Sequence, residues 1–109
     1  MITISQSTIA KLKANWGDKA EALDCKAELR VYDPLSRWVC YIFAMNPANE
    51  NEIKVLVSLR PNMQPMMLEC TLDDINLRYN QDGEHMEVDA EYRPRDVSTL
   101  FIKLSEGYR

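Results

Sequence analysis

Two segments of this chain have the length of β-strands but opposite hydrophobic patterns. Residues 38–45 (WVCYIFAM) are apolar without a break, whereas residues 85–93 (HMEVDAEYR) alternate between apolar and polar side chains. A continuous apolar run predicts a strand buried on both faces, and strict alternation predicts a strand with one face in water. We therefore expect a sheet that contains both segments, with an acidic face on the second.

The length and charge of the chain limit the classes of function that it can have. The 109 residues fit a single domain, 1–109, and the net charge is −4. Broad electrostatic binding to nucleic acids or anionic membranes needs a surplus of Lys and Arg, so both kinds of partner are disfavoured. No apolar run approaches the ~20 residues that a membrane-spanning helix requires.

The cysteines and the single histidine argue against a metal or cofactor site. Cys25, Cys40 and Cys70 are widely spaced, no Cys-x-x-Cys occurs, and His85 is the only histidine. A four-ligand zinc site of the usual spacing cannot be assembled from these residues, and we expect neither a metal nor a cofactor. The odd cysteine count and the absence of a secretory signal predict a cytoplasmic protein.

The remaining periodicities predict an α+β fold. We expect an antiparallel sheet of about five strands, with two or three short helices packed mainly on one face. Thr71 and Asp74 resemble a capping box at the start of a helix. Residues 18–24 fit either a helical turn or a loop. The expected strands are 26–32, 37–45, 53–59, 66–70 and 85–93, and the expected helices are 6–16, a short one after Thr71, and a last one from about residue 97.

Acidic residues dominate the second half of the chain. Between residues 69 and 91 there are eight acids and one base, Arg78, and three of the acids would share one face of the strand 85–93. Three interpretations remain open: a solvated face that discourages edge pairing, a surface for a basic partner protein, and a divalent-cation site. The candidate binding residues are Glu87, Asp89, Glu91, Asp73, Asp74, Tyr32, Asp33 and Trp38.

Several short motifs resemble, in order, a family found largely on bacterial plasmids, integrative elements and phages, the domain of unknown function 2958. The motifs are residues 9–15, 31–34 with 37–41, 71–75, 87–94 and 97–100. The chain departs from the family at residues 66–70 and at 80–83, where the family has Leu-Gly-Tyr-Phe and a glycine-rich loop. The resemblance implies a cytoplasmic protein of a mobile element, with no established catalytic residue to carry over.

The leading hypothesis is a non-enzymatic protein-interaction domain, an accessory protein of a mobile genetic element that binds a host or element-encoded macromolecule through its acidic surface. The partner would be a protein, basic or itself associated with nucleic acid. One alternative is a small metal-dependent hydrolase that uses His85 with Asp89 or Asp82. Another is a nucleic-acid-binding domain with a local basic patch of Arg93, Arg95, Lys103 and Arg109. Exposure of Met63, Met66 and Met67, and the oligomeric state, stay open at this level.

Overall fold

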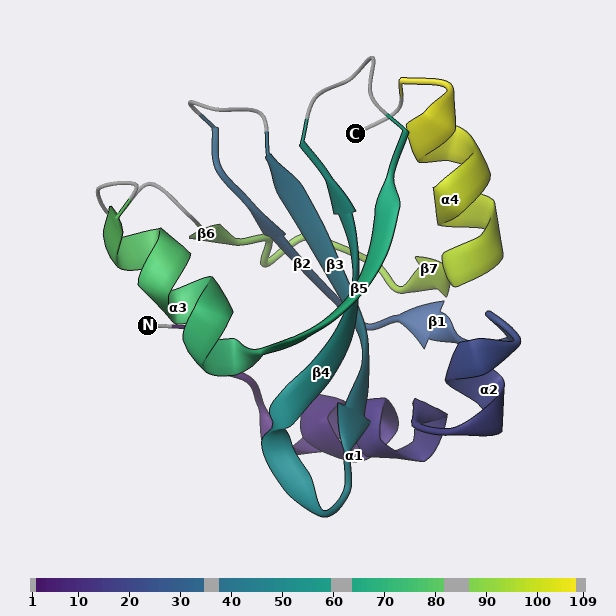
Figure 1. The fold of residues 1–109 in the computed structure, drawn as a ribbon, viewed down its shortest axis with the longest axis vertical. Coiled ribbons are helices and arrows are strands. Elements are labelled where there is room, and N and C mark those ends of the chain that lie inside the picture. Colours follow the sequence, from purple (N-terminus) through teal and green to yellow (C-terminus); the bar gives the residue numbers. More distant parts are fainter. Residues whose placement is uncertain (1, 35–37, 60–63, 82–86, 108–109) are drawn as a thin grey trace.

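The protein is built on an antiparallel sheet of five strands in the order β5-β4-β3-β2-β6, as the computed structural model shows (Figure 1). The structure describes residues 2–34, 38–59, 64–81 and 87–107, with side chains described outside 78–81. A separate two-stranded ribbon pairs β1 with β7. The α+β class and the five-stranded antiparallel sheet are therefore confirmed. The strands are β1 (Lys26–Ala27), β2 (Leu29–Tyr32), β3 (Val39–Asn46), β4 (Asn49–Ser58), β5 (Met66–Thr71), β6 (Glu87–Val88) and β7 (Arg95–Asp96).

The apolar run of the sequence forms β3, the middle strand of the sheet. Every residue from Val39 to Met45 is buried, as the unbroken pattern predicts. Alternate side chains enter different cores: Cys40 and Ile42 lie in one, and Val39 and Tyr41 in the other. The register with β4 shifts between Ile42 and Ala44, which is a β-bulge, and the side-chain amide of Asn15 donates a hydrogen bond of 3.0 Å to the carbonyl of Phe43.

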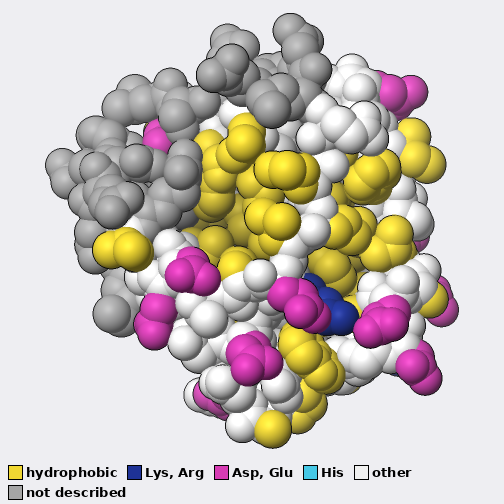
Figure 2. Space-filling view, in the orientation of Figure 1, with side chains coloured by type: hydrophobic (Ala, Val, Ile, Leu, Met, Phe, Trp, Pro, Cys, Tyr) yellow, Lys and Arg dark blue, Asp and Glu magenta, His cyan; other side chains and the backbone are white. Residues whose placement is uncertain are grey.

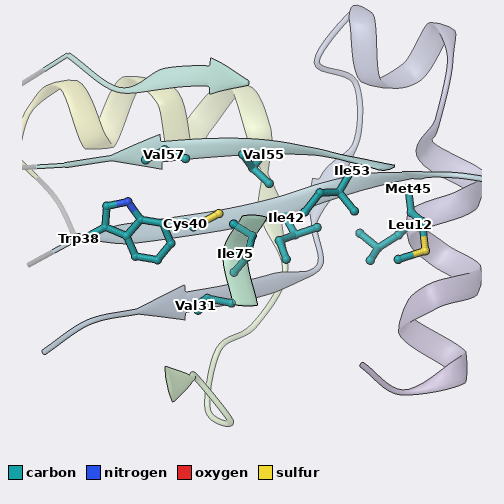
Figure 3. Packing of buried hydrophobic residues seen from close by; sticks show 10 residues of the cluster. All are labelled: Leu12, Val31, Trp38, Cys40, Ile42, Met45, Ile53, Val55, Val57 and Ile75. Carbon is teal, nitrogen blue, oxygen red and sulfur yellow. The ribbon is translucent and has the colours of Figure 1, made fainter. Parts of the chain in front are cut away.

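Helices cover both faces of the sheet, and in Figure 1 α3 and α4 stand on opposite sides of it. Leu12 and Ile75 come from α1 and α3 into the core drawn in Figure 3, whereas Leu100 and Leu104 of α4 enter the second core. The expectation that the helices pack mainly on one face is wrong, because a strand buried on both faces needs cover on each. The helices are α1 (Gln6–Asn15), α2 (Asp18–Glu21), α3 (Leu72–Gln81) and α4 (Val97–Ser105).

The predicted helix boundaries rest on local hydrogen bonds. The Ser5 hydroxyl accepts from the Thr8 backbone N–H and caps α1. Thr71 and Asp74 form the predicted capping box, since each backbone N–H donates to the other side chain at 3.0 Å. Both capping bonds satisfy backbone donors that the first turn of a helix leaves unpaired.

Two of the predicted strands are shorter than the sequence pattern indicates. The segment 26–32 divides into β1 and β2 at Glu28, and the continuous strand over 85–93 is wrong. In the described part of that segment, β6 is limited to Glu87–Val88, and the chain turns at Ala90 and Glu91. The turn carries the chain away from β2 and toward β1, with which β7 pairs.

Truncating a side chain in the middle of β3 should strongly destabilise the domain. Ile42 is fully buried, so Ile42→Ala is expected to lower the free energy of unfolding by about 2–5 kcal/mol. Leu77→Ala is the control, because Leu77 is 56% exposed on α3 and its loss should cost well under about 1 kcal/mol. Urea denaturation of both variants measures the difference; equal losses would show that β3 is not the centre of the core.

Candidate functional site

The three acids of the segment 87–91 do not form a continuous face in water. Glu87 accepts a hydrogen bond of 2.8 Å from the Tyr32 hydroxyl. Asp89 pairs with Arg30 at 3.1 Å and also accepts from the backbone N–H of Glu91. Two of the three carboxylates are thus engaged within the chain. The other members of the proposed metal site, Asp82 and His85, lie outside the described residues.

The remaining candidate binding residues divide into buried and exposed groups. Asp33 and Trp38 are 3% and 5% exposed, so they are not available to a partner in this structure, and Tyr32 is half-buried. Asp73 and Asp74 are exposed in the first turn of α3. Asp73 also exchanges hydrogen bonds of 3.1 and 3.2 Å with Asn51 of β4. The candidate residues therefore do not converge on one surface.

A pocket of about 360 Å³, here named the arginine pocket, opens beside β2 and β3. Arg30 lines this pocket: Nη1 donates to Asp89, Nε donates to the Tyr41 hydroxyl at 3.2 Å, and the guanidinium stacks 4.7 Å from the centre of the Tyr32 ring. These contacts fix a partly buried cation in one orientation. The lining residues are Arg30, Tyr41, Asp89, Glu91, Tyr92, Arg93 and Arg95.

Tyr92 attaches the segment between β6 and β7 to the rest of the fold. Its hydroxyl donates a hydrogen bond of 2.7 Å to the Ala27 carbonyl and accepts one of 3.3 Å from the Arg95 backbone N–H. Its ring packs against Tyr41 with centroids 5.6 Å apart. Burial raises the pKa of the Tyr92 hydroxyl, against the smaller opposing effect of the Arg95 backbone N–H, so the hydroxyl stays protonated at neutral pH.

Strand β5 forms a second distinctive surface, because it is the last strand on its side of the sheet. Met66 and Leu68 are 40% and 43% exposed. Met66, whose exposure the sequence leaves open, is therefore an exposed side chain. Met67 is half-buried and Met63 lies outside the described residues. Figure 2 shows apolar side chains gathered in the middle of this face and acidic side chains along its lower half.

The carboxylates on this face outnumber their cationic partners. Lys54 of β4 lies between Glu21 and Glu69, at 3.8 and 3.5 Å, and its own side chain is only 14% exposed. Glu21 and Glu69 remain 74% and 71% exposed, so they keep most of their contact with water. Exposed pairs of this kind contribute little to stability. The Lys54 charge is therefore shared between Glu21 and Glu69, and Glu69 lies on the face of β5 opposite Met66 and Leu68.

The chemistry of the described residues offers no assembled catalytic set. Within the described ranges, no group of three or more His, Cys, Asp or Glu side chains could hold a metal ion. Burial, followed by the nearby charge of Asp74, raises the pKa of the Cys70 thiol to about 11. A nucleophilic cysteine needs the opposite shift, because the thiolate is the reactive form.

Searches of family models, of curated proteins and of solved structures give no match to this chain. The resemblance to the domain of unknown function 2958 therefore stays a prediction from the motifs. As for membranes, none of the helices in the described part of the chain has the length and apolar composition needed to cross a bilayer.

No pattern in the sequence indicates the arginine pocket. Arg30 and Tyr41 are 11 residues apart, and Arg30 and Asp89 are 59 apart. The alternative of a nucleic-acid-binding domain places Arg93 and Arg95 in a basic patch with Lys103 and Arg109. They instead line a pocket that also contains two carboxylates, and Arg109 lies outside the described residues.

Removing the Tyr92 hydroxyl should loosen the segment that it attaches. Tyr92→Phe loses two hydrogen bonds and leaves the Ala27 carbonyl without this donor, so we expect a loss of about 1–3 kcal/mol in the free energy of unfolding. Tyr32→Phe is the matched control, since the Tyr32 hydroxyl donates to the exposed carboxylate of Glu87. Urea denaturation that gave Tyr32→Phe the larger loss would contradict the assigned role of Tyr92.

The raised pKa of Cys70 predicts a loss of stability in alkali. In the unfolded chain the thiol ionises near its ordinary pKa of 9.0, whereas in the folded protein it ionises near 11. Its contribution is complete below pH 9 and is lost as the pH rises toward 11. Because the residue is only half-buried, the decline between pH 8 and 10 should be smaller by about 1 kcal/mol in Cys70→Ala. Denaturant titrations at the two pH values measure this; identical declines would refute it.

Proposed function

We propose that this domain is a non-enzymatic protein-interaction module that binds an extended segment of a partner protein along the outer edge of β5. The segment carries apolar side chains and at least one basic side chain. The observation that supports this proposal is the position of β5: it is the last strand of the sheet, it exposes apolar side chains, and carboxylates border it.

The backbone of β5 supplies the general affinity in this proposal. Among the residues that the structure describes, β5 has one neighbour in the sheet, β4, with which Met66–Thr71 pair in continuous register. The outward-facing N–H and C=O groups of an edge strand are a template for another strand. An added segment would gain main-chain hydrogen bonds from them, as in other cases of strand addition.

The side chains of β5 supply the selectivity. Met66 and Leu68 pair with Val57 and Val55 of β4 and share their face of the sheet, so an apolar side chain of the partner can pack beside them. Glu69 points to the other face, and Asp73 and Asp74 follow directly in α3. A Lys or Arg of the partner would therefore meet carboxylates at the C-terminal end of β5.

The proposed partner is a basic protein, as the sequence predicts, but its contact surface is β5 and not Glu87, Asp89 and Glu91. The setting, a cytoplasmic accessory protein of a mobile genetic element, rests only on the motif resemblance and on the cysteine pattern. A hydrolase with Asp89 as base is less favoured, because both carboxylate oxygens already accept hydrogen bonds, one from Arg30 and one from the backbone N–H of Glu91. Direct nucleic-acid binding is less favoured because Arg93 and Arg95 share their pocket with Asp89 and Glu91.

Selection of random peptides of about ten residues on the immobilised protein tests the proposal. The enriched peptides should combine alternating apolar residues with Lys or Arg, and their binding should protect β5 amides from hydrogen exchange. Leu68→Lys should weaken binding at least tenfold, about 1.4 kcal/mol, because it places a charge against the apolar part of the segment.

Ile102→Lys is the control variant, because Ile102 is an exposed apolar side chain that belongs to α4 and not to β5. It should leave peptide binding unchanged. Enriched peptides that bind Leu68→Lys as well as the unaltered protein would overturn the proposal. Dimerisation of the unaltered chain that Leu68→Lys abolishes would also overturn it, since the occupant of the edge would then be a second copy.

A further inference from the structure

The arginine pocket lies on the opposite side of the strand order from β5, between β2, β3 and the segment that follows β6. We propose that this pocket binds a single carboxylate group, carried by a small organic acid or by the C-terminus of a peptide. This site is independent of the proposed function, since it shares no residue with the β5 edge.

Arg30 is already oriented for such a ligand. Its Nε and Nη1 atoms contact Tyr41 and Asp89, and within the described residues nothing bonds to Nη2. The side chain is 17% exposed and is held between the Tyr32 and Tyr41 rings, at 4.7 and 5.9 Å. A guanidinium fixed in this way offers its remaining donors without a further loss of side-chain freedom.

Arg93 is the second donor of the proposed site. It is exposed and lines the same pocket, and in the described part of the chain it has no hydrogen-bond or ion-pair partner. Its neighbour Arg95 is set in place through its backbone N–H, which donates to the Tyr92 hydroxyl. The segment that carries both arginines is therefore attached to the core beside Arg30.

The charge of the pocket matches a singly charged group. Arg30, Arg93 and Arg95 and the carboxylates of Asp89 and Glu91 give the lining a formal charge of +1. A carboxylate balances this formal charge, whereas a doubly charged phosphoryl group would leave a net negative charge beside Asp89 and Glu91. Planar guanidinium groups also bind carboxylates through paired hydrogen bonds, which adds geometric selectivity.

Acetate is the simplest probe of this site, with sodium chloride used to hold the ionic strength constant. During a titration followed by NMR, the side-chain Nε–Hε signals of Arg30 and Arg93 should shift and saturate. A short peptide with a free C-terminus and its amidated form distinguish the two sources of the carboxylate. Binding of the free-terminus peptide in preference to the amidated one identifies a peptide ligand. Binding of acetate without binding of either peptide identifies a small organic acid. Either result supports the proposal.

Arg93→Gln should reduce the acetate affinity at least tenfold, and Lys11→Gln, which removes one exposed charge from α1, should leave it unchanged. Saturable shifts of equal strength in both variants would overturn the assignment of the site. The absence of any saturable shift with acetate or with the free-terminus peptide would also overturn it. Tighter binding of inorganic phosphate than of acetate at pH 7.5 would contradict the charge argument.

Discussion

Burial of β3 on both faces is the constraint on which the rest of this structure depends. A strand with unbroken apolar side chains can lie only in the interior of a sheet that is covered on each side. The chain meets this condition with α1 and α3 over one face and α2 and α4 over the other. The bulge near Phe43 adjusts the alternation so that Phe43 and Ala44 both enter the second core.

The central position of β3 also decides where the sheet ends. One edge is β6, of which the structure describes two residues, and it is attached to β2 through the Tyr32–Glu87 and Arg30–Asp89 contacts. A short edge that carries charges is a poor template for another strand. The other edge is β5, which is six residues long and mostly apolar. The two edges are therefore unequal, and this inequality underlies the assignment of different roles to β5 and to the arginine pocket.

Much of the fold could be predicted from local sequence patterns, because it depends on interactions between residues that are close in the sequence. The apolar run, the alternation of 53–59 and the capping box of Thr71 and Asp74 each describe interactions within a few residues or the two faces of one strand. The same apolar run, taken to its consequence, also requires helices on both faces. The order of helices and strands along the chain, and not the hydrophobic pattern, is what wrongly suggests helices mainly on one face.

The failures fall where distant side chains decide the path of the chain. Alternation over 85–93 indicates a strand, but the chain turns after Val88. On either side of this turn, Asp89 bonds to Arg30 and Tyr92 bonds to the carbonyl of Ala27. No periodicity within the segment encodes these partners, which lie about sixty residues earlier. The arginine pocket was missed for the same reason, since its lining comes from three separate parts of the chain.

Amide hydrogen exchange of the free protein tests the central claim, that β3 is the interior strand and β5 an open edge. Strands paired on both sides exchange only through large-scale unfolding, whereas outward-facing amides of an edge exchange through local fluctuation. We expect the slowest exchange throughout β3, and fast exchange at alternate amides of β5. Uniform protection of β5 at the level of β3 would contradict it, because that edge would then be covered in the free protein.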